Sequence, residues 1–130
     1  VYCKIMKKLY YALAMLLMSV AVSAHELTPT YPIIEPAYVT GVSVVKMSLW
    51  NRRDDVKYYE INVYDVDWNP VDFATTERLI KIGYLERKTF DVYVRDDDKD
   101  KVEYVCTVSK QLKEDVKSSG IKSRICSRMK

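Results

Sequence analysis

The chain has very little of two residues that many active sites need. Among its 130 residues there is one histidine, His25, and there are three glycines. A Ser–His–Asp hydrolase would have to take its base from His25, and a phosphate-binding loop would need closely spaced glycines. No zinc motif or nucleophile elbow is present either. The sequence therefore predicts a protein that is not an enzyme and that holds no cofactor.

The single histidine and one acidic run are the places where a metal could bind. With residues 1–24 removed, His25 would offer its amine and ring to copper, as in copper-dependent polysaccharide monooxygenases and some periplasmic copper carriers. Those monooxygenases need a second histidine, which is missing here, so we predict no tight copper site. The run DDDKDK at 96–101 lacks the Gly and terminal Glu of a calcium loop and predicts a solvated turn. We expect no metal.

The first 24 residues have the pattern of a secretory signal peptide. Lys7 and Lys8 precede residues 9–22, which carry no charge, and the run ends in Val22-Ser23-Ala24. The alternative is a membrane anchor, but the run is short of the ~20 residues that span a bilayer. We therefore predict cleavage after Ala24, a periplasmic or secreted protein, and no stable membrane anchor afterwards. Met6 has the position of an initiator.

Charge is unevenly distributed over the mature chain, residues 25–130. Removal of the signal lowers Lys and Arg from 21 to 18, which equals the 18 Asp and Glu. A nearly neutral domain argues against a nucleic-acid partner, which needs a net basic face. Residues 25–109 nevertheless carry a net charge of −5 and residues 110–130 a net charge of +5. The length suits a single domain.

Alternating apolar and polar residues predict strands over most of the mature chain. Eleven tyrosines and few glycines also favour β-structure. We expect an edge strand at 31–34, strands at 42–50 and 56–66, short strands at 71–76 and 78–82, a hairpin of 89–95 with 102–108, and a last strand at 121–129. Residues 110–119 predict a polar connection. About seven strands joined by short turns predict an all-β, immunoglobulin-like sandwich.

The alternation also predicts which side chains face the core. Three strands present one continuous apolar face each. These faces comprise Val45, Met47 and Leu49; Tyr59, Ile61 and Val63; and Phe90, Val92 and Val94. Trp50 and Trp68 are interpreted as core or rim residues rather than as a ligand platform.

The mature chain keeps two cysteines, Cys106 and Cys126, for which export favours one disulfide over two free thiols. The two differ in their neighbours, because Cys106 shares a face with Tyr104 and Val108 whereas Cys126 shares one with Arg124. Either a bulge brings them together, or the face of residues 102–108 is less buried than its apolar residues suggest.

Several short motifs resemble a known family. They are LWN at 49–51, YYEINVYD at 58–65, NPVDFATTE at 69–77 and KTFDVYVR at 88–95, and Asp100, Tyr104 and Cys106 have the D-x-x-x-Y-x-C spacing of an immunoglobulin-like strand. Together they are similar to the first domain of the periplasmic pilus-assembly chaperones. That resemblance implies the same fold and a protein client, such as a pilus-like subunit.

Two departures from that family concern the site. Its members have a second domain, and they hold the client's terminal carboxylate with an Arg in the first strand and a Lys in the last. Here the first strand offers Glu35, and only Lys122 or Arg124 could stand in for the Lys.

The last strand is the predicted client-binding strand. Client binding by strand pairing would use Ile121, Ile125 and Met129 as apolar anchors, with Lys122 and Arg124 beside them. The alternative is a secreted structural or adhesive immunoglobulin-like domain of a surface appendage or particle.

Overall fold

A computed structural model describes residues 1–17, 24–111 and 122–130 of the chain. Helix α1 (Tyr2–Leu17) has no buried residue, so the rest of the molecule holds its core without it. Within the described residues, no helix is both long enough and apolar enough to cross a membrane. The cleavage signal and the 110–119 connection fall largely outside these residues.

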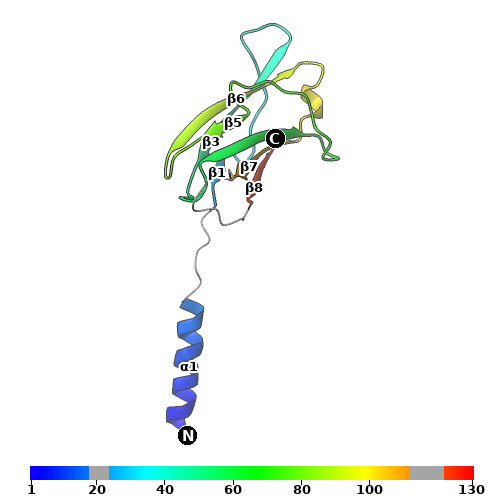
Figure 1. The fold of residues 1–130 in the computed structure, drawn as a ribbon. Coiled ribbons are helices and arrows are strands. Elements are labelled where there is room, and N and C mark those ends of the chain that lie inside the picture. Colours follow the sequence, from blue (N-terminus) through cyan, green and yellow to red (C-terminus); the bar gives the residue numbers. More distant parts are fainter. Residues whose placement is uncertain (18–23, 112–121) are drawn as a thin grey trace.

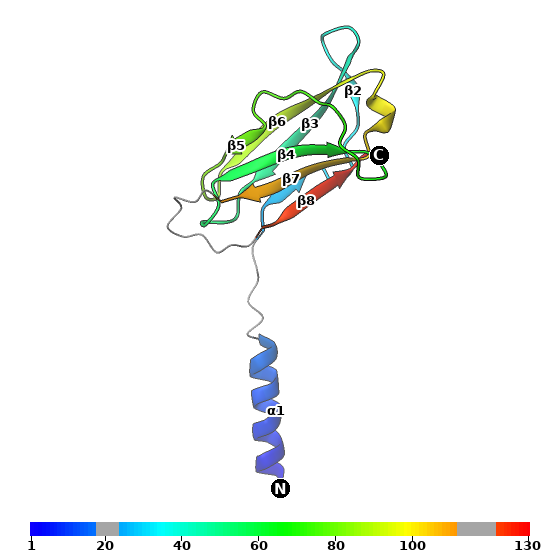
Figure 2. The same cartoon turned by 45° about the vertical axis from the view of Figure 1, so that its right-hand side comes forward.

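The remaining elements form two antiparallel sheets packed face to face (Figures 1 and 2). In the first, called the β3 sheet, β3 (Val42–Trp50) pairs along its whole length with β6 (Arg87–Arg95). On its other side β3 pairs with the short strands β1 (Glu26–Thr28) and β2 (Glu35–Pro36).

The second sheet, called the β7 sheet, has the order β5–β4–β7–β8. Its strands are β4 (Tyr58–Tyr64), β5 (Leu79–Lys81), β7 (Tyr104–Lys110) and β8 (Arg124–Arg128). Figure 2 looks onto this sheet, with β3 and β6 behind it and β8 at one side. A short 3₁₀ turn, Lys99–Lys101, follows β6.

The core lies between the sheets and uses the faces that the alternation predicted. All nine side chains expected inside β3, β4 and β6 are buried, and Val45, Leu49, Tyr59, Ile61 and Val92 have no exposed surface. Successive side chains of a strand point to opposite sides, so a period of two sorts them without knowledge of the partner strand. The predicted inner faces of these three strands are confirmed.

The pairing of the central strands differs from the prediction. The runs at 89–95 and 102–108 are not a hairpin, because β6 pairs with β3 whereas β7 pairs with β4 and β8. The acidic run between them carries the chain from one sheet to the other. Alternation shows which residues of a strand share a face, but it does not show which other strand pairs with it. The hairpin prediction was wrong for this reason.

The first edge strand is also in a different place. Residues 31–34 form no strand, and the pairing with β3 is made by β1 before them and β2 after them. Between these strands the chain crosses to the other sheet, where the carbonyls of Thr30 and Pro32 accept hydrogen bonds from the Arg128 and Lys130 amides at 3.1 Å each. Residue numbers increase in the same direction along both segments, from 30 to 32 and from 128 to 130, so this segment runs parallel to the end of β8.

Two further strand predictions hold in part. The run 78–82 contains β5, but the run 71–76 is represented only by an isolated bridge between Ala74 and Tyr93. The predicted last strand begins later than expected, at Arg124, and Ile121 lies outside the described residues.

Candidate client-binding edge and the polar cluster beside it

Strand β8 is one of the two edge strands of the β7 sheet, so one side of its backbone faces β7 and the other faces outward. The Ser123 carbonyl accepts from the Ser109 amide and the Met129 amide donates to the Glu103 carbonyl, so the backbone N–H and C=O groups of odd-numbered residues point toward β7. The backbone groups of even-numbered residues point away from β7. Arg128 donates to Thr30, which leaves the N–H and C=O groups of Arg124 and Cys126 without a backbone partner among the described residues.

The apolar side chains of this strand turn inward. Ile125 and Met129 are half-buried and pack against the core, and Ser127 between them is buried. Both side chains therefore already pack in part against the domain itself, and their assignment as anchors for a client stays a prediction. The β7–β8 register pairs the odd-numbered residues of β8 with the buried, odd-numbered residues of β7. The side chains of odd-numbered residues in β8 therefore point toward the core. Arg124 and Lys122 are exposed.

The structure joins Cys106 to Cys126, with an S–S distance of 2.01 Å. The two residues are direct partners in an uninterrupted β7–β8 register, so no bulge is needed. Both lie on the outer face, and the inner face of β7 carries Val105, Thr107 and Ser109 instead. The second of the two explanations offered by the sequence therefore applies.

Trp68 lies over this part of the outer face. Its ring stacks on Tyr104 with centroids 4.0 Å apart, and the Arg124 guanidinium lies 5.0 Å from its centroid. These partners lie diagonally on either side of the Cys106–Cys126 pair, and Cys106 has no exposed surface. Arginines likewise contact Trp50, with the Arg52 and Arg87 guanidinium carbons at 5.2 and 5.5 Å. Neither indole presents a free platform.

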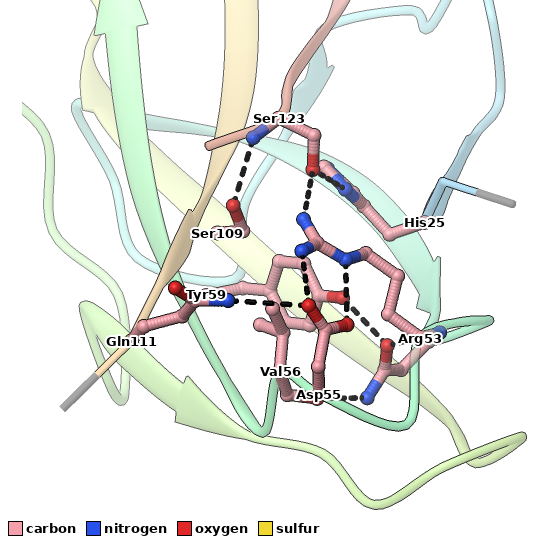
Figure 3. Close-up of polar contacts among 9 residues, drawn as sticks. His25, Arg53, Asp55, Val56, Tyr59, Ser109, Gln111 and Ser123 are labelled. Atoms are coloured by element: carbon pink, nitrogen blue, oxygen red, sulfur yellow. Dashed lines mark hydrogen bonds and ion pairs between the residues drawn. The ribbon is translucent and has the colours of Figure 1, made fainter. Parts of the chain in front are cut away.

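A buried polar cluster lies at the end of the sandwich where β1 begins (Figure 3). Its centre is Asn51, which follows β3 and has no exposed surface. The side-chain nitrogen of Asn51, Nδ2, donates to the carbonyls of Val56 and Ile82 at 2.7 and 2.9 Å. Its oxygen accepts from the Arg53 amide at 2.9 Å and from the Tyr59 hydroxyl at 2.5 Å. One side chain thus satisfies four groups in three segments.

His25 belongs to the same cluster and is not a mobile chain end. It is 2% exposed, Nδ1 lies 3.1 Å from Ser123 Oγ, and Nε2 lies 2.8 Å from Thr107 Oγ1. Its ring packs on Tyr59 with centroids 4.6 Å apart. Burial lowers the pKa of His25 from 6.5 to about 4, and the Arg53 charge acts in the same direction. Burial also raises the pKa of Tyr59 to about 12.

Arg53 and Asp55 complete the cluster with a two-point ion pair. Arg53 Nε and Nη2 donate to the two carboxylate oxygens of Asp55 at 2.9 and 2.6 Å, an interaction that raises the pKa of Arg53. Arg53 Nη1 reaches Ser123 Oγ at 3.4 Å, and the Ser123 amide donates to Ser109 Oγ at 2.8 Å (Figure 3). The cluster therefore ties the start of β1 and the approach to β8 to the β3–β4 turn.

Sequence reasoning missed this cluster, because it considered His25 only as a possible base or copper ligand. The available signal was Asn51, a polar residue directly after a buried strand, followed by Arg53 and Asp55 two and four positions later. That pattern reads equally well as a solvated turn, and only the folded chain brings Ser123 and Thr107 to it.

Other predicted site residues lie apart from one another. Glu35 pairs with Val44 in the β3 sheet, whereas Arg124 is the first residue of β8 in the β7 sheet and Lys122 lies two residues before it. In the acidic run, Asp96 accepts from the Ser43 hydroxyl and Asp98 pairs with Lys101 at 3.3 Å. Over the described ranges, no group of three or more His, Cys, Asp or Glu side chains could hold a metal ion.

Comparison with known proteins identifies the fold. No protein-family model matches the chain, and no curated protein matches it by sequence. The crystal structure of the E. coli chaperone DraB is similar, with a TM-score of 0.61 and 15% identity over 82% of this chain and 53% of DraB. A FixG-related protein from Vibrio parahaemolyticus gives a TM-score of 0.49 and 16% identity over 83% and 96% of the two chains.

The chain thus spans about half of the length of DraB. The likeness confirms the predicted all-β, immunoglobulin-like sandwich and a fold shared with a chaperone.

Proposed function

We propose that this chain is an exported chaperone-like or assembly-accessory module that holds a protein client by strand pairing along β8. The carrying observation is the open outer side of β8, where Arg124 and Cys126 present backbone groups without a backbone partner in the described chain. Likeness to the chaperone DraB supports the same function. The role is one of binding, not of catalysis.

The length of the open edge limits what it can do alone. Four backbone groups, at about 1 kcal/mol net for each hydrogen bond, give at best a dissociation constant on the order of 1 mM, before the entropy cost of association is subtracted. A client must therefore gain affinity from side chains as well. The exposed Arg124 and Lys122 would attract acidic residues, and the exposed Tyr31 and Ile33 lie on the segment that crosses to β8.

Rigidity favours this strand as a template. The ladder to β7 and the disulfide to Cys106 hold β8 in its extended form before any client arrives. A preformed strand loses little conformational entropy on pairing, so more of the interaction energy appears as affinity. The disulfide and the signal-like residues 1–24 support an exported location, periplasmic or secreted.

A proline at Arg124 tests the proposal. The Arg124 amide points away from β7, so Arg124→Pro removes an outward donor and leaves the ladder to β7 intact. The matched control is Arg124→Gln, which loses the same charge and the same contact with Trp68 but keeps the amide. We expect co-purification of a client from periplasm to fail with the proline variant and to survive with glutamine, at similar melting temperatures.

The opposite result is informative too. Equal capture by both variants would exclude strand pairing at β8. Truncation after Ser127 is a poorer test, because the lost Arg128 and Lys130 amides also hold Thr30 and Pro32 in place. Absence of any client, together with self-association that the proline abolishes, would favour the structural or adhesive alternative.

A further inference from the structure

Strand β6 leaves a second open edge, on the other sheet. The Asp96 amide donates to Gly41 and the Tyr93 amide to Ala74, so even-numbered residues of this region face β3 and odd-numbered ones face away. Ala74 occupies only the Tyr93 position. The backbone groups of Arg87, Thr89 and Asp91 therefore face outward, with no backbone partner among the described residues.

The edge is open because the neighbouring segment leaves it. Ala74 and Tyr93 exchange two hydrogen bonds of 2.8 Å, as the first pair of an antiparallel ladder would. Four residues later the Arg78 carbonyl accepts from Ile61, so the chain has joined the β7 sheet. At the point of departure the buried Thr75 hydroxyl has no hydrogen-bond partner within the part of the chain that the structure describes. The segment thus forms one residue pair with β6 and then leaves β6 for the other sheet.

The segment with these three outward-facing residues, Arg87, Thr89 and Asp91, is complementary to itself. We propose that two copies of this chain pair β6 with β6, antiparallel, about a two-fold axis at Thr89. In that register Arg87 lies opposite Asp91 of the second copy, and the same pair recurs by symmetry. Thr89 lies opposite its own counterpart. All three pairs join residues whose backbone groups face outward, so each is of the hydrogen-bonded type.

The register also fits the ends of the edge. The pairing stops at Asp91, so the second copy does not reach Tyr93, where Ala74 already sits. Lys88 is the one charge on the inner side of this edge, and an inward-pointing charge normally discourages pairing. Its ammonium instead donates to the Lys81 carbonyl at 2.7 Å, which turns it away from the edge. Such a short interface predicts a weak dimer.

This dimer is independent of client binding at β8. β6 and β8 are edges of different sheets, and β8 has β1 rather than β6 near it. A β6 dimer therefore leaves both β8 strands open and makes the assembly bivalent toward any partner of that edge.

Charge reversal with rescue tests the register. Residues 25–130, whose core is complete without α1, are followed by sedimentation equilibrium over a concentration series. Arg87→Asp and Asp91→Arg should each weaken the dimer by at least about tenfold, because each places like charges opposite each other. The variant with both changes restores opposite charges and should recover the dimer. A rescue of this kind is specific to the antiparallel two-fold register.

A second pair of variants tests the backbone contact. Thr89→Pro removes the central amide and should abolish the dimer, whereas Thr89→Val keeps that amide and should not. Melting temperatures report whether each variant folds. A wild-type protein that stays monomeric at every concentration, a double variant that fails to recover, or a dimer that persists with proline at a normal melting temperature would each overturn the proposal.

Discussion

Replacement of Asn51 by alanine should lower the free energy of unfolding by about 4 kcal/mol, at about 1 kcal/mol for each hydrogen bond. The estimate follows from the four bonds that this side chain makes with Val56, Ile82, Arg53 and Tyr59. All four partner groups would lose a bonding partner that is itself fully buried. Small domains have about 5–15 kcal/mol in total, so the variant should be marginal.

Urea unfolding of the oxidised protein measures this difference. Asn62→Ala is the matched control, since Asn62 is half-buried on the outer side of the neighbouring strand β4. We expect the control to change the unfolding midpoint little. A loss below about 1 kcal/mol for Asn51→Ala would mean that water or a rearranged turn replaces the four bonds, and the account of the cluster would then be incorrect.

Three further outcomes follow from the same structure. Because the pKa of His25 falls from 6.5 to about 4 on folding, the unfolded chain binds a proton that the folded one does not; stability should be highest above pH 6.5 and decrease as the pH drops toward 4. The decrease should be about 2–3 kcal/mol, and urea titrations with His25→Gln should lack it. Alkylation without reduction should label neither Cys106 nor Cys126 in a mass spectrum, and removal of both thiols should cost about 3 kcal/mol for a loop of this length; two labelled thiols would contradict the disulfide. Ile125→Asp should destabilise the fold by more than about 3 kcal/mol because it places a charge against the core, whereas Arg124→Gln on the opposite face should melt normally; equal melting temperatures would refute the inward register of β8.

The sequence was a good guide to strands that bury one apolar face. Val45, Ile61 and Val92 were placed correctly because each belongs to a run in which every second residue is apolar. It was a poor guide to β7. In β7, the face with Tyr104 and Val108 is the more apolar one, but the face that points to the core carries Thr107 and Ser109.

Thr107 and Ser109 can occupy the inner face of β7 for a chemical reason. Hydroxyl groups can be buried when they have partners, and here His25 and Ser123 supply them. Those partners are far away in the sequence. The same separation in sequence hides the cluster around Asn51, which brings together His25, the turn after β3 and Ser123.

By itself, the sequence determined the fold class, the inner faces of the main strands and the two cysteines available for a disulfide, because all of these depend on local alternation or on residue identity. Only the tertiary structure decided which strands are neighbours, and hence that β8 and β6 are edges. An edge is defined by the absence of a neighbouring strand, and no local pattern records what is missing beside a strand. The open backbone groups of Arg124 and Thr89 follow from that arrangement alone.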